Sequence, residues 1–239
     1  MTDHTMKAFD TDLQELARMV AEMGGHAEKQ VADSVDALAK RDTALAQRVS
    51  AADAHINALQ REIEQKAVLT IARRQPMAVD LRELVGALRI ANDLERVGDL
   101  AKNIAKRVVA LNGEFPPPKL IRGVEHMTDL VLQQFKLVLD AYAHRDVGKA
   151  MSVWRGDEEV DAVCTSVFRE LLTYMMEDPR NITFCIHLMF CAKNIERMGD
   201  HATNIAESVY YIIEGRQLDD ERPKGDTTTI AAPPMAGAR

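Results

Sequence analysis

Two carboxylates four residues apart occur twice in the chain. They lie within the similar segments ANDLERVGDLAKNIA, which begins at Ala91, and AKNIERMGDHATNIA, which begins at Ala192. The two pairs are Glu95 with Asp99 and Glu196 with Asp200. Acids at this spacing share one face of a helix and repel each other, and Gly98 or Gly199 destabilises its helix by about 1 kcal/mol relative to Ala. The repetition of both unfavourable features indicates a chemical role or a packing role.

A cation-binding site is one role that fits these acids. Hard divalent or ferric cations prefer several carboxylate oxygens, and two acids one turn apart supply them from one rigid helix. The preceding helix of each half carries companions at the same spacing, Asp53 with Asn57 and Asp157 with Asp161. Asn103 and Asn204, four residues after Asp99 and Asp200, lie on the same polar helix faces and offer additional ligand oxygens. The sequence therefore predicts two candidate metal sites, and the second is the richer in acids.

A solvated helix face is the alternative interpretation. On a helical wheel each acid pair falls opposite the apolar stripe of its helix, where Arg96 or Arg197 would neutralise the acids in solvent. Gly98 would then serve only to let a neighbouring helix pack closely. Both interpretations stay open on the sequence alone.

No catalytic machinery is visible in the sequence. Ferritin-like di-metal oxidases use Glu-x-x-His pairs, and none of the seven histidines follows a Glu by three residues. His201 is more simply a packing or surface histidine, because Leu100 takes its place in the first copy. The sequence also lacks a Gly-rich phosphate loop with its Lys-Ser/Thr ending. We therefore expect a protein that is not an enzyme.

Long helices are expected to carry these residues. Ala, Leu, Glu, Lys, Arg and Met dominate over long spans where Gly and Pro are sparse, which favours helix over strand. Apolar residues recur at helical spacing, and Pro76 and Pro179 are expected to open the third helix of each half. The predicted fold class is all-α, with two tandem, internally duplicated three-helix bundles whose long helices are like those of spectrin repeats.

The two halves are related residue by residue. A shift of 104 positions places DALAKRDTALAQRVSAAD on DAYAHRDVGKAMSVWRGD, and a shift of 101 makes 10 of the 18 positions from Ala91 to Val108 identical to the second copy. Gene duplication explains this similarity. We predict a first repeat at 1–111, a Pro-rich linker at 112–119, a second repeat at 120–214 and a disordered tail at 215–239.

Charge and cysteine content argue against several other classes. The formal net charge of −7 argues against a nucleic-acid binder, since that affinity rests on cationic groups. The start MTDHTMKAFD lacks the features of a secretory signal, so we expect a cytoplasmic protein that reaches a membrane only through partners. Cys164, Cys185 and Cys191 are odd in number and form no C-x-x-C pair, which predicts buried reduced thiols.

Three segments carry a resemblance to a known family. They are FDTDLQELARMVAEMGG, RRQPMAVDLRELVGALRIANDLERVGDLAKNIA and YMMEDPRNITFCIHLMFCAKNIERMGDHATNIAE. From about residue 5 to residue 215 the sequence resembles the PhoU family of accessory regulators of phosphate-specific transport. The resemblance implies two similar bundles side by side, with iron or zinc bound at the E-x-x-x-D motifs and not needed for the fold. Asn57 departs from this pattern, because the second copy has Asp161 there, and this weakens the first site.

The resemblance also implies a function. It implies a negative regulator of phosphate uptake and of the phosphate-starvation response. Such proteins couple the ATPase subunit of the phosphate ABC importer to a sensor histidine kinase, and we expect a homodimer in this role. A metal-independent helical scaffold is the alternative, and a di-metal carboxylate oxidase is a weaker one.

Overall fold

The structure, a computed structural model, describes residues 2–111 and 118–219. Over these residues it contains helices and no strand, which confirms the predicted all-α class. The first half comprises α1 (Thr2–Lys40), α2 (Thr43–Arg74) and α3 (Ala78–Ala110). The second half comprises α4 (Pro118–His144), α5 (Val147–Arg155), α6 (Asp157–Glu177), the 3-10 helix η1 (Pro179–Asn181) and α7 (Ile182–Glu214). Within the two described ranges, no helix is long and apolar enough to cross a membrane.

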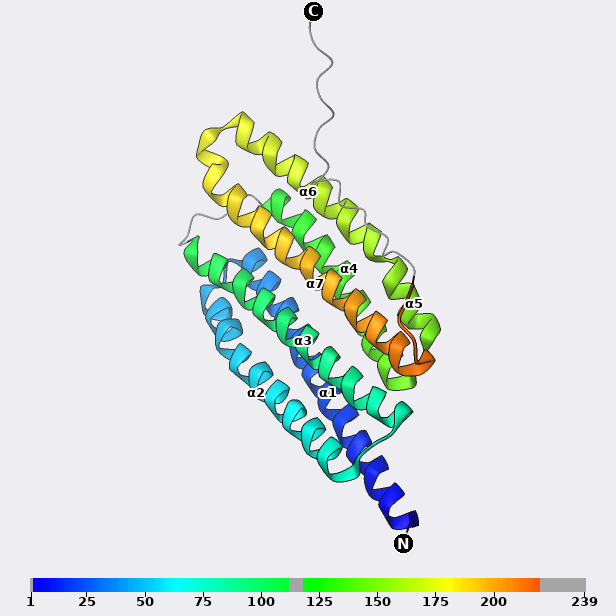
Figure 1. Cartoon of the computed structure of the whole chain (residues 1–239). Coiled ribbons are helices and arrows are strands. Elements are labelled where there is room, and N and C mark those ends of the chain that lie inside the picture. Colours follow the sequence, from blue (N-terminus) through cyan, green and yellow to red (C-terminus); the bar gives the residue numbers. More distant parts are fainter. Residues whose placement is uncertain (1, 112–117, 220–239) are drawn as a thin grey trace, which may run out of the picture.

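The helices form two bundles that lie side by side. Figure 1 shows α1, α2 and α3 as one bundle and α4, α5–α6 and α7 as the other. Helices α3 and α7 run antiparallel along the boundary between the bundles, where α1 also packs against α4. The α2–α3 and α6–α7 connections lie at opposite ends of the molecule (Figure 1). Both helices that carry an acid motif are therefore central.

The turn between the first and second helix has the same geometry in both halves. Arg41 and Arg145 adopt positive φ angles of 60° and 53°, which places them in the left-handed region that ends many helices. The next residues, Asp42 and Asp146, cap the following helix, because each carboxylate accepts a bond from the backbone N–H three residues on, at 2.8 and 3.0 Å. The duplication thus preserves the turn as well as the helices.

Helix boundaries differ from the predictions at three points. Helix α3 begins at Ala78 and not at Pro76, and Pro179 opens η1 and not α7. The second helix of the second half is interrupted at Gly156, whose N–H closes α5 by donating to the carbonyl groups of Ser152 and Val153. Glycine in a helix interior is costly, and this one marks a break where the first half has a continuous α2.

The predicted linker and tail fall partly outside the described residues. Positions 112–117 of the linker and 220–239 of the tail lie outside them, whereas 118–119 belong to α4. Gly215 ends α7 with a φ of 75°, and Leu218 packs against the core. The described part of the chain therefore extends slightly past the predicted end of the second repeat.

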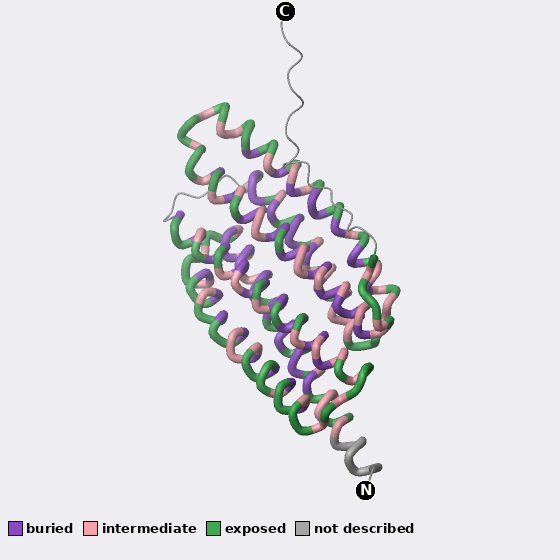
Figure 2. Tube along the Cα trace, in the orientation of Figure 1, coloured by how far each residue is buried: buried purple, intermediate pink, exposed green. Residues whose placement is uncertain are grey.

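One continuous hydrophobic core runs through both bundles. Figure 2 shows buried positions on the faces that the helices turn toward one another, and exposed positions on the outer face of α2. The approach of α3 to α7 requires a glycine, since a methyl group at Gly86 would overlap the side chain of Ile212. The predicted buried, free thiols are confirmed for Cys164, Cys185 and Cys191.

The glycine inside the first acid motif sits against a buried glutamine from α1. The side-chain amide of Gln30 donates to the carbonyl of Val49 on α2 at 3.1 Å. A Cβ at Gly98 would lie 3.0 Å from Cδ1 of Ile56 and 3.2 Å from Oε1 of Gln30. Both neighbours are buried, so the glycine admits a close three-helix contact.

The second copy repeats this contact with more space. Gln134 donates to the carbonyl of Gly156 at 3.0 Å, and a Cβ at Gly199 would lie 3.5 Å from its Oε1. Val160 stands where the first half has Ile56, and it would lie 3.6 Å from that Cβ. The smaller side chain leaves ordinary van der Waals room at Gly199.

Replacement of the two motif glycines by alanine should therefore have different effects. Gly199→Ala should raise the free energy of unfolding by about 0.5–1 kcal/mol, because the methyl group fits and alanine favours helix. Gly98→Ala should show no such gain or should destabilise, because Ile56 and Gln30 must move. Chemical denaturation measures both, and Gly98→Ala should be better tolerated in an Ile56→Val background. Equal gains at the two glycines would show that the packing around Gly98 is loose.

Candidate functional site

The first acid cluster lies between α2 and α3. Asp53 from α2 is buried, and the half-buried Glu95 and Asp99 face it from α3. Lys102 lies among these acids: its Nζ is 2.7 Å from Oδ2 of Asp53 and 3.5 Å from Oδ1 of Asp99. The first cluster thus contains a cation that belongs to the protein itself.

Lys102 compensates only part of the negative charge. Its hydrogen bond to Asp53 raises the pKa of the Lys102 ammonium, so Lys102 stays protonated. Burial raises the pKa of Glu95, and the neighbouring carboxylates of Asp99 and Asp53 raise it further. Asn57 donates from Nδ2 to Oδ2 of Asp53 at 3.1 Å and so takes part in the cluster as a neutral hydrogen-bond donor.

The second acid cluster lies between α6 and α7. Asp157 and Asp161 occupy the first turns of α6, where the N-terminal backbone N–H groups favour negative charge. Glu196 and Asp200 face them from α7, and the exposed fractions of Asp157, Asp161 and Glu196 are only 3%, 5% and 7%. The break at Gly156 makes Asp157 the first residue of a helix, whereas Asp53 lies inside α2.

The position of Lys102 is occupied by Thr203 in the second half. The Thr203 hydroxyl is buried and lies 3.3 Å from Oδ1 of Asp157, so a neutral donor replaces the ammonium. Lys193 contacts the cluster at Glu196, with Nζ 2.7 Å from Oε1. Burial nevertheless raises the pKa of Glu196, and the carboxylates of Asp200 and Asp161 add to the rise.

The motif acids differ in burial: Glu196 is buried, whereas Glu95, Asp99 and Asp200 are half-buried. Their companions Asp53, Asp157 and Asp161 are all buried, so neither cluster is fully solvated. Two elements of the solvated-face alternative are present among the described residues: Arg96 pairs with Glu95 at 3.6 Å, and neighbouring helices pack closely at Gly98. Carboxylates held in this way are suited to bind a cation or to hydrogen-bond a neighbouring helix.

The remaining predicted residues lie at the edge of the clusters or outside them. Asn103 is exposed on α3. Asn204 donates to Oδ1 of Asp93 at 3.3 Å, and Nδ1 of His201 lies 2.8 Å from the same oxygen. These contacts join α7 to α3, so His201 packs between the two halves, which is one of the two roles that the sequence left open.

Neither acid cluster is the tightest group of ligand atoms in the described part of the chain. Among the described residues, the ligand atoms of Glu22, His26 and His55 all lie within 4.8 Å of one another, which is close enough for one metal ion. Sequence reasoning did not single out this group. A cation in either acid cluster requires the carboxylates to approach one another more closely, which their mutual repulsion opposes until the charge is neutralised.

The PhoU domain family matches residues 20–108 and 124–209, one match in each half. The chain belongs to the PhoU family. Two curated relatives are both named phosphate-specific transport system accessory protein PhoU homolog. That of Rhizobium meliloti is 61% identical over 95% of both chains, and that of Caulobacter vibrioides is 53% identical over 95% of this chain and 98% of its own.

Solved PhoU structures have the same fold. The crystal structure of PhoU from Pseudomonas aeruginosa is 40% identical and superposes with a TM-score of 0.83, covering 87% of this chain and all of that one. The phosphate transport system regulatory protein PhoU from Streptococcus pneumoniae is 27% identical, with a TM-score of 0.81 over 88% of this chain and 99% of its own. These PhoU relatives are named accessory or regulatory proteins.

The raised pKa of Glu196 predicts a pH-dependent stability difference. The folded-state pKa of Glu196 lies above the unfolded value of about 4.3, so between these two pKa values the folded chain binds more protons than the unfolded chain. The free energy of unfolding therefore falls as the pH rises from the unfolded to the folded pKa. Glu196→Gln should therefore raise the melting temperature near neutral pH in chelator-treated protein. The gain should shrink as the pH falls below about 4.3, where the wild-type carboxyl is protonated in both states.

Glu125→Gln provides a control for this measurement, because Glu125 is exposed on α4. It should leave the melting temperature nearly unchanged at both pH values. A pH-independent effect of Glu196→Gln would contradict the electrostatic explanation.

Proposed function

We propose that this protein is a negative regulator of phosphate uptake and of the phosphate-starvation response. In this proposal it acts as a cytoplasmic, homodimeric adaptor without enzymatic activity, between the ATPase subunit of the phosphate ABC importer and a sensor histidine kinase. The observation that carries the proposal is its similarity, over 95% of both chains, to a relative named an accessory protein of phosphate-specific transport. The similarity includes both halves, so the whole duplicated body belongs to the functional unit.

The two ends of the molecule support an adaptor role. Apolar side chains are exposed around the α2–α3 connection, at Val68, Leu69, Met77, Val79 and Leu81. A second exposed set surrounds the α6–α7 connection, at Leu172, Met176, Ile182, Ile186 and Phe190. Because these connections lie at opposite ends of the molecule (Figure 1), two partners can bind at once without competing for space.

Regulation requires that the adaptor distinguish between states of its partners. A protein that binds two conformations of the transporter equally tightly shifts no equilibrium. We therefore propose that the adaptor prefers one conformation of the ATPase subunit, and that the preferred complex holds the kinase signal off when phosphate is plentiful.

Deletion of the gene tests this function. Phosphate-starvation genes should switch on in phosphate-rich medium, and the wild-type chain should restore repression. Met77→Glu and Met176→Glu, which place a charge on each exposed apolar end, should each fail to restore it. Ala44→Glu, exposed at the opposite end of α2 from the α2–α3 connection, serves as the matched control and should restore repression. Starvation genes that stay repressed after deletion would remove the proposed function.

The acid clusters are the proposed regulatory cation sites. Carboxylate donors favour divalent or ferric cations, with iron or zinc as the physiological ions in this proposal. The four acids of the second cluster have a threonine where the first cluster has Lys102, so the second cluster is the stronger candidate. A bound cation would offset the repulsion that raises the pKa of Glu196.

Lys102→Thr makes the first cluster resemble the second and tests the role of the internal ammonium. Without added metal, the variant should melt at a lower temperature, because buried Asp53 loses its cationic partner. Added Mn²⁺ should then raise the melting temperature of the variant more than that of the wild type, since ligands that bind only the folded state stabilise it.

Lys106→Thr, an exposed lysine one turn further along α3, is the matched control and should behave like the wild type. Equal metal-induced shifts in Lys102→Thr and the wild type would show that removing the Lys102 ammonium creates no cation site in the first cluster. The metal-independent scaffold would then become the preferred description of the first half.

A further inference from the structure

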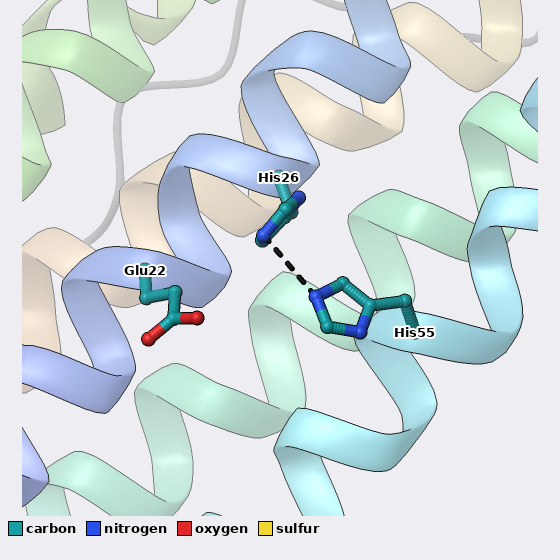
Figure 3. A group of neighbouring side chains, drawn as sticks. All are labelled: Glu22, His26 and His55. Carbon is teal, nitrogen blue, oxygen red and sulfur yellow. Dashed lines mark hydrogen bonds between the residues drawn. The ribbon is translucent and has the colours of Figure 1, made fainter.

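Two histidines from different helices meet on the surface of the first bundle. His26 lies on α1 and His55 on α2, and their Nε2 atoms are 3.2 Å apart. Figure 3 shows the two rings meeting edge to face across the gap between the helices, with the hydrogen bond between their Nε2 atoms dashed and Glu22 one turn before His26 on α1. All three side chains are exposed, and their ligand atoms lie within 4.8 Å of one another.

The separation of the two nitrogens matches that of ligands on one metal ion. In a tetrahedral zinc site the metal–nitrogen distance is about 2.0–2.1 Å, so two nitrogen ligands lie about 3.3–3.4 Å apart. The 3.2 Å between the Nε2 atoms of His26 and His55 is close to this value. The rings are nearly perpendicular, at 88°, an edge-to-face arrangement with centroids 4.4 Å apart.

Glu22 supplies a third ligand from the same helix face as His26. Residues four apart on a helix are neighbours, and the Glu22 carboxylate needs to move by only about 1–2 Å to complete a site with ligands at zinc distances. Its partner is Arg18, at 3.1 Å, whose side chain is 69% exposed. A surface ion pair of this kind contributes little and does not prevent the movement.

We propose that Glu22, His26 and His55 bind a divalent transition-metal ion of the zinc class. Three protein ligands leave at least one coordination position for water or an exogenous ligand. Imidazole nitrogen selects Zn²⁺, Ni²⁺ or Cu²⁺ over Mg²⁺ and Ca²⁺, whereas the acid clusters offer only oxygen. The site is therefore chemically distinct from both E-x-x-x-D clusters.

The site also has a structural consequence, because it joins α1 to α2. An ion held by one residue pair on α1 and one residue on α2 would lock the first helical hairpin at a point far from its turn. The second half lacks the site: the positions 104 residues later are His126, Leu130 and Glu159. We expect one such ion per chain.

Binding of Zn²⁺ to the full chain tests the site. Isothermal titration of chelator-treated protein should show one zinc equivalent that the double variant His26→Asn, His55→Asn loses or binds at least about tenfold more weakly. The zinc-induced rise in melting temperature should fall in parallel. Mg²⁺ at the same concentration should not reproduce the rise at this site.

The control is a second pair of exposed histidines. His126→Asn with His144→Asn removes the same number of imidazoles outside the site and should leave zinc binding unchanged. Glu196→Ala with Asp200→Ala removes carboxylates of the second acid cluster and should leave this zinc equivalent in place. Circular dichroism should confirm that every variant is as helical as the wild type.

The outcomes separate this proposal from the proposed function. If the wild type and the His26, His55 double variant bind zinc equally, the proposal is overturned. It is also overturned if the His126, His144 double variant weakens zinc binding as much as the His26, His55 double variant does. Zinc would then be binding nonspecifically to surface histidines. Neither result bears on the deletion phenotype or on the response of the acid clusters to Mn²⁺.

Discussion

The packing of α3 against α7 is the constraint on which the rest of the structure depends. Each of these helices is surrounded by the other two helices of its own bundle and by its counterpart from the other bundle. The contact requires Gly86, because a larger residue would overlap Ile212, and it is joined by the bonds from His201 and Asn204 to Asp93. With one side of each motif helix occupied in this way, the motif acids are directed toward the second helix of their own bundle.

That placement explains why a helix face that looks polar in sequence becomes a buried acid cluster. Carboxylates between two helices lose hydration, and each needs hydrogen bonds or a nearby positive charge to remain ionised. The first bundle solves this with Lys102 and Asn57, whereas the second uses a hydroxyl, the N-terminus of α6 and Lys193. The same backbone arrangement thus supports two different electrostatic solutions, and the difference arose after the duplication.

The sequence predicted the repeat, the all-α class and the partner helices of the acid motifs, because all three depend on short-range periodicity and internal similarity. It did not predict the break at Gly156, which looks like a tolerated glycine in a long apolar pattern. The burial of Glu196 was also missed, since a helical wheel describes one helix and not the helices packed beside it. Hints of the Glu22, His26 and His55 group were present: the first two residues are one turn apart, and the histidines lie 15 residues before Arg41 and 13 after Asp42. Only the packed hairpin shows that they meet.

The exchange of Lys102 for Thr203 has a consequence for how the two bundles respond to their surroundings. A covalently attached ammonium is always present at its site, whatever the composition of the solution, and its local concentration is set by the chain. At the equivalent position the second cluster has a hydroxyl, and its own ammonium, that of Lys193, contacts Glu196. The first bundle therefore places its lysine on the acid from its second helix, whereas the second bundle has a lysine on the glutamate of the motif itself. Corresponding carboxylates of the duplicated body thus have different partners, so the same change in pH or salt acts on a different acid in each half.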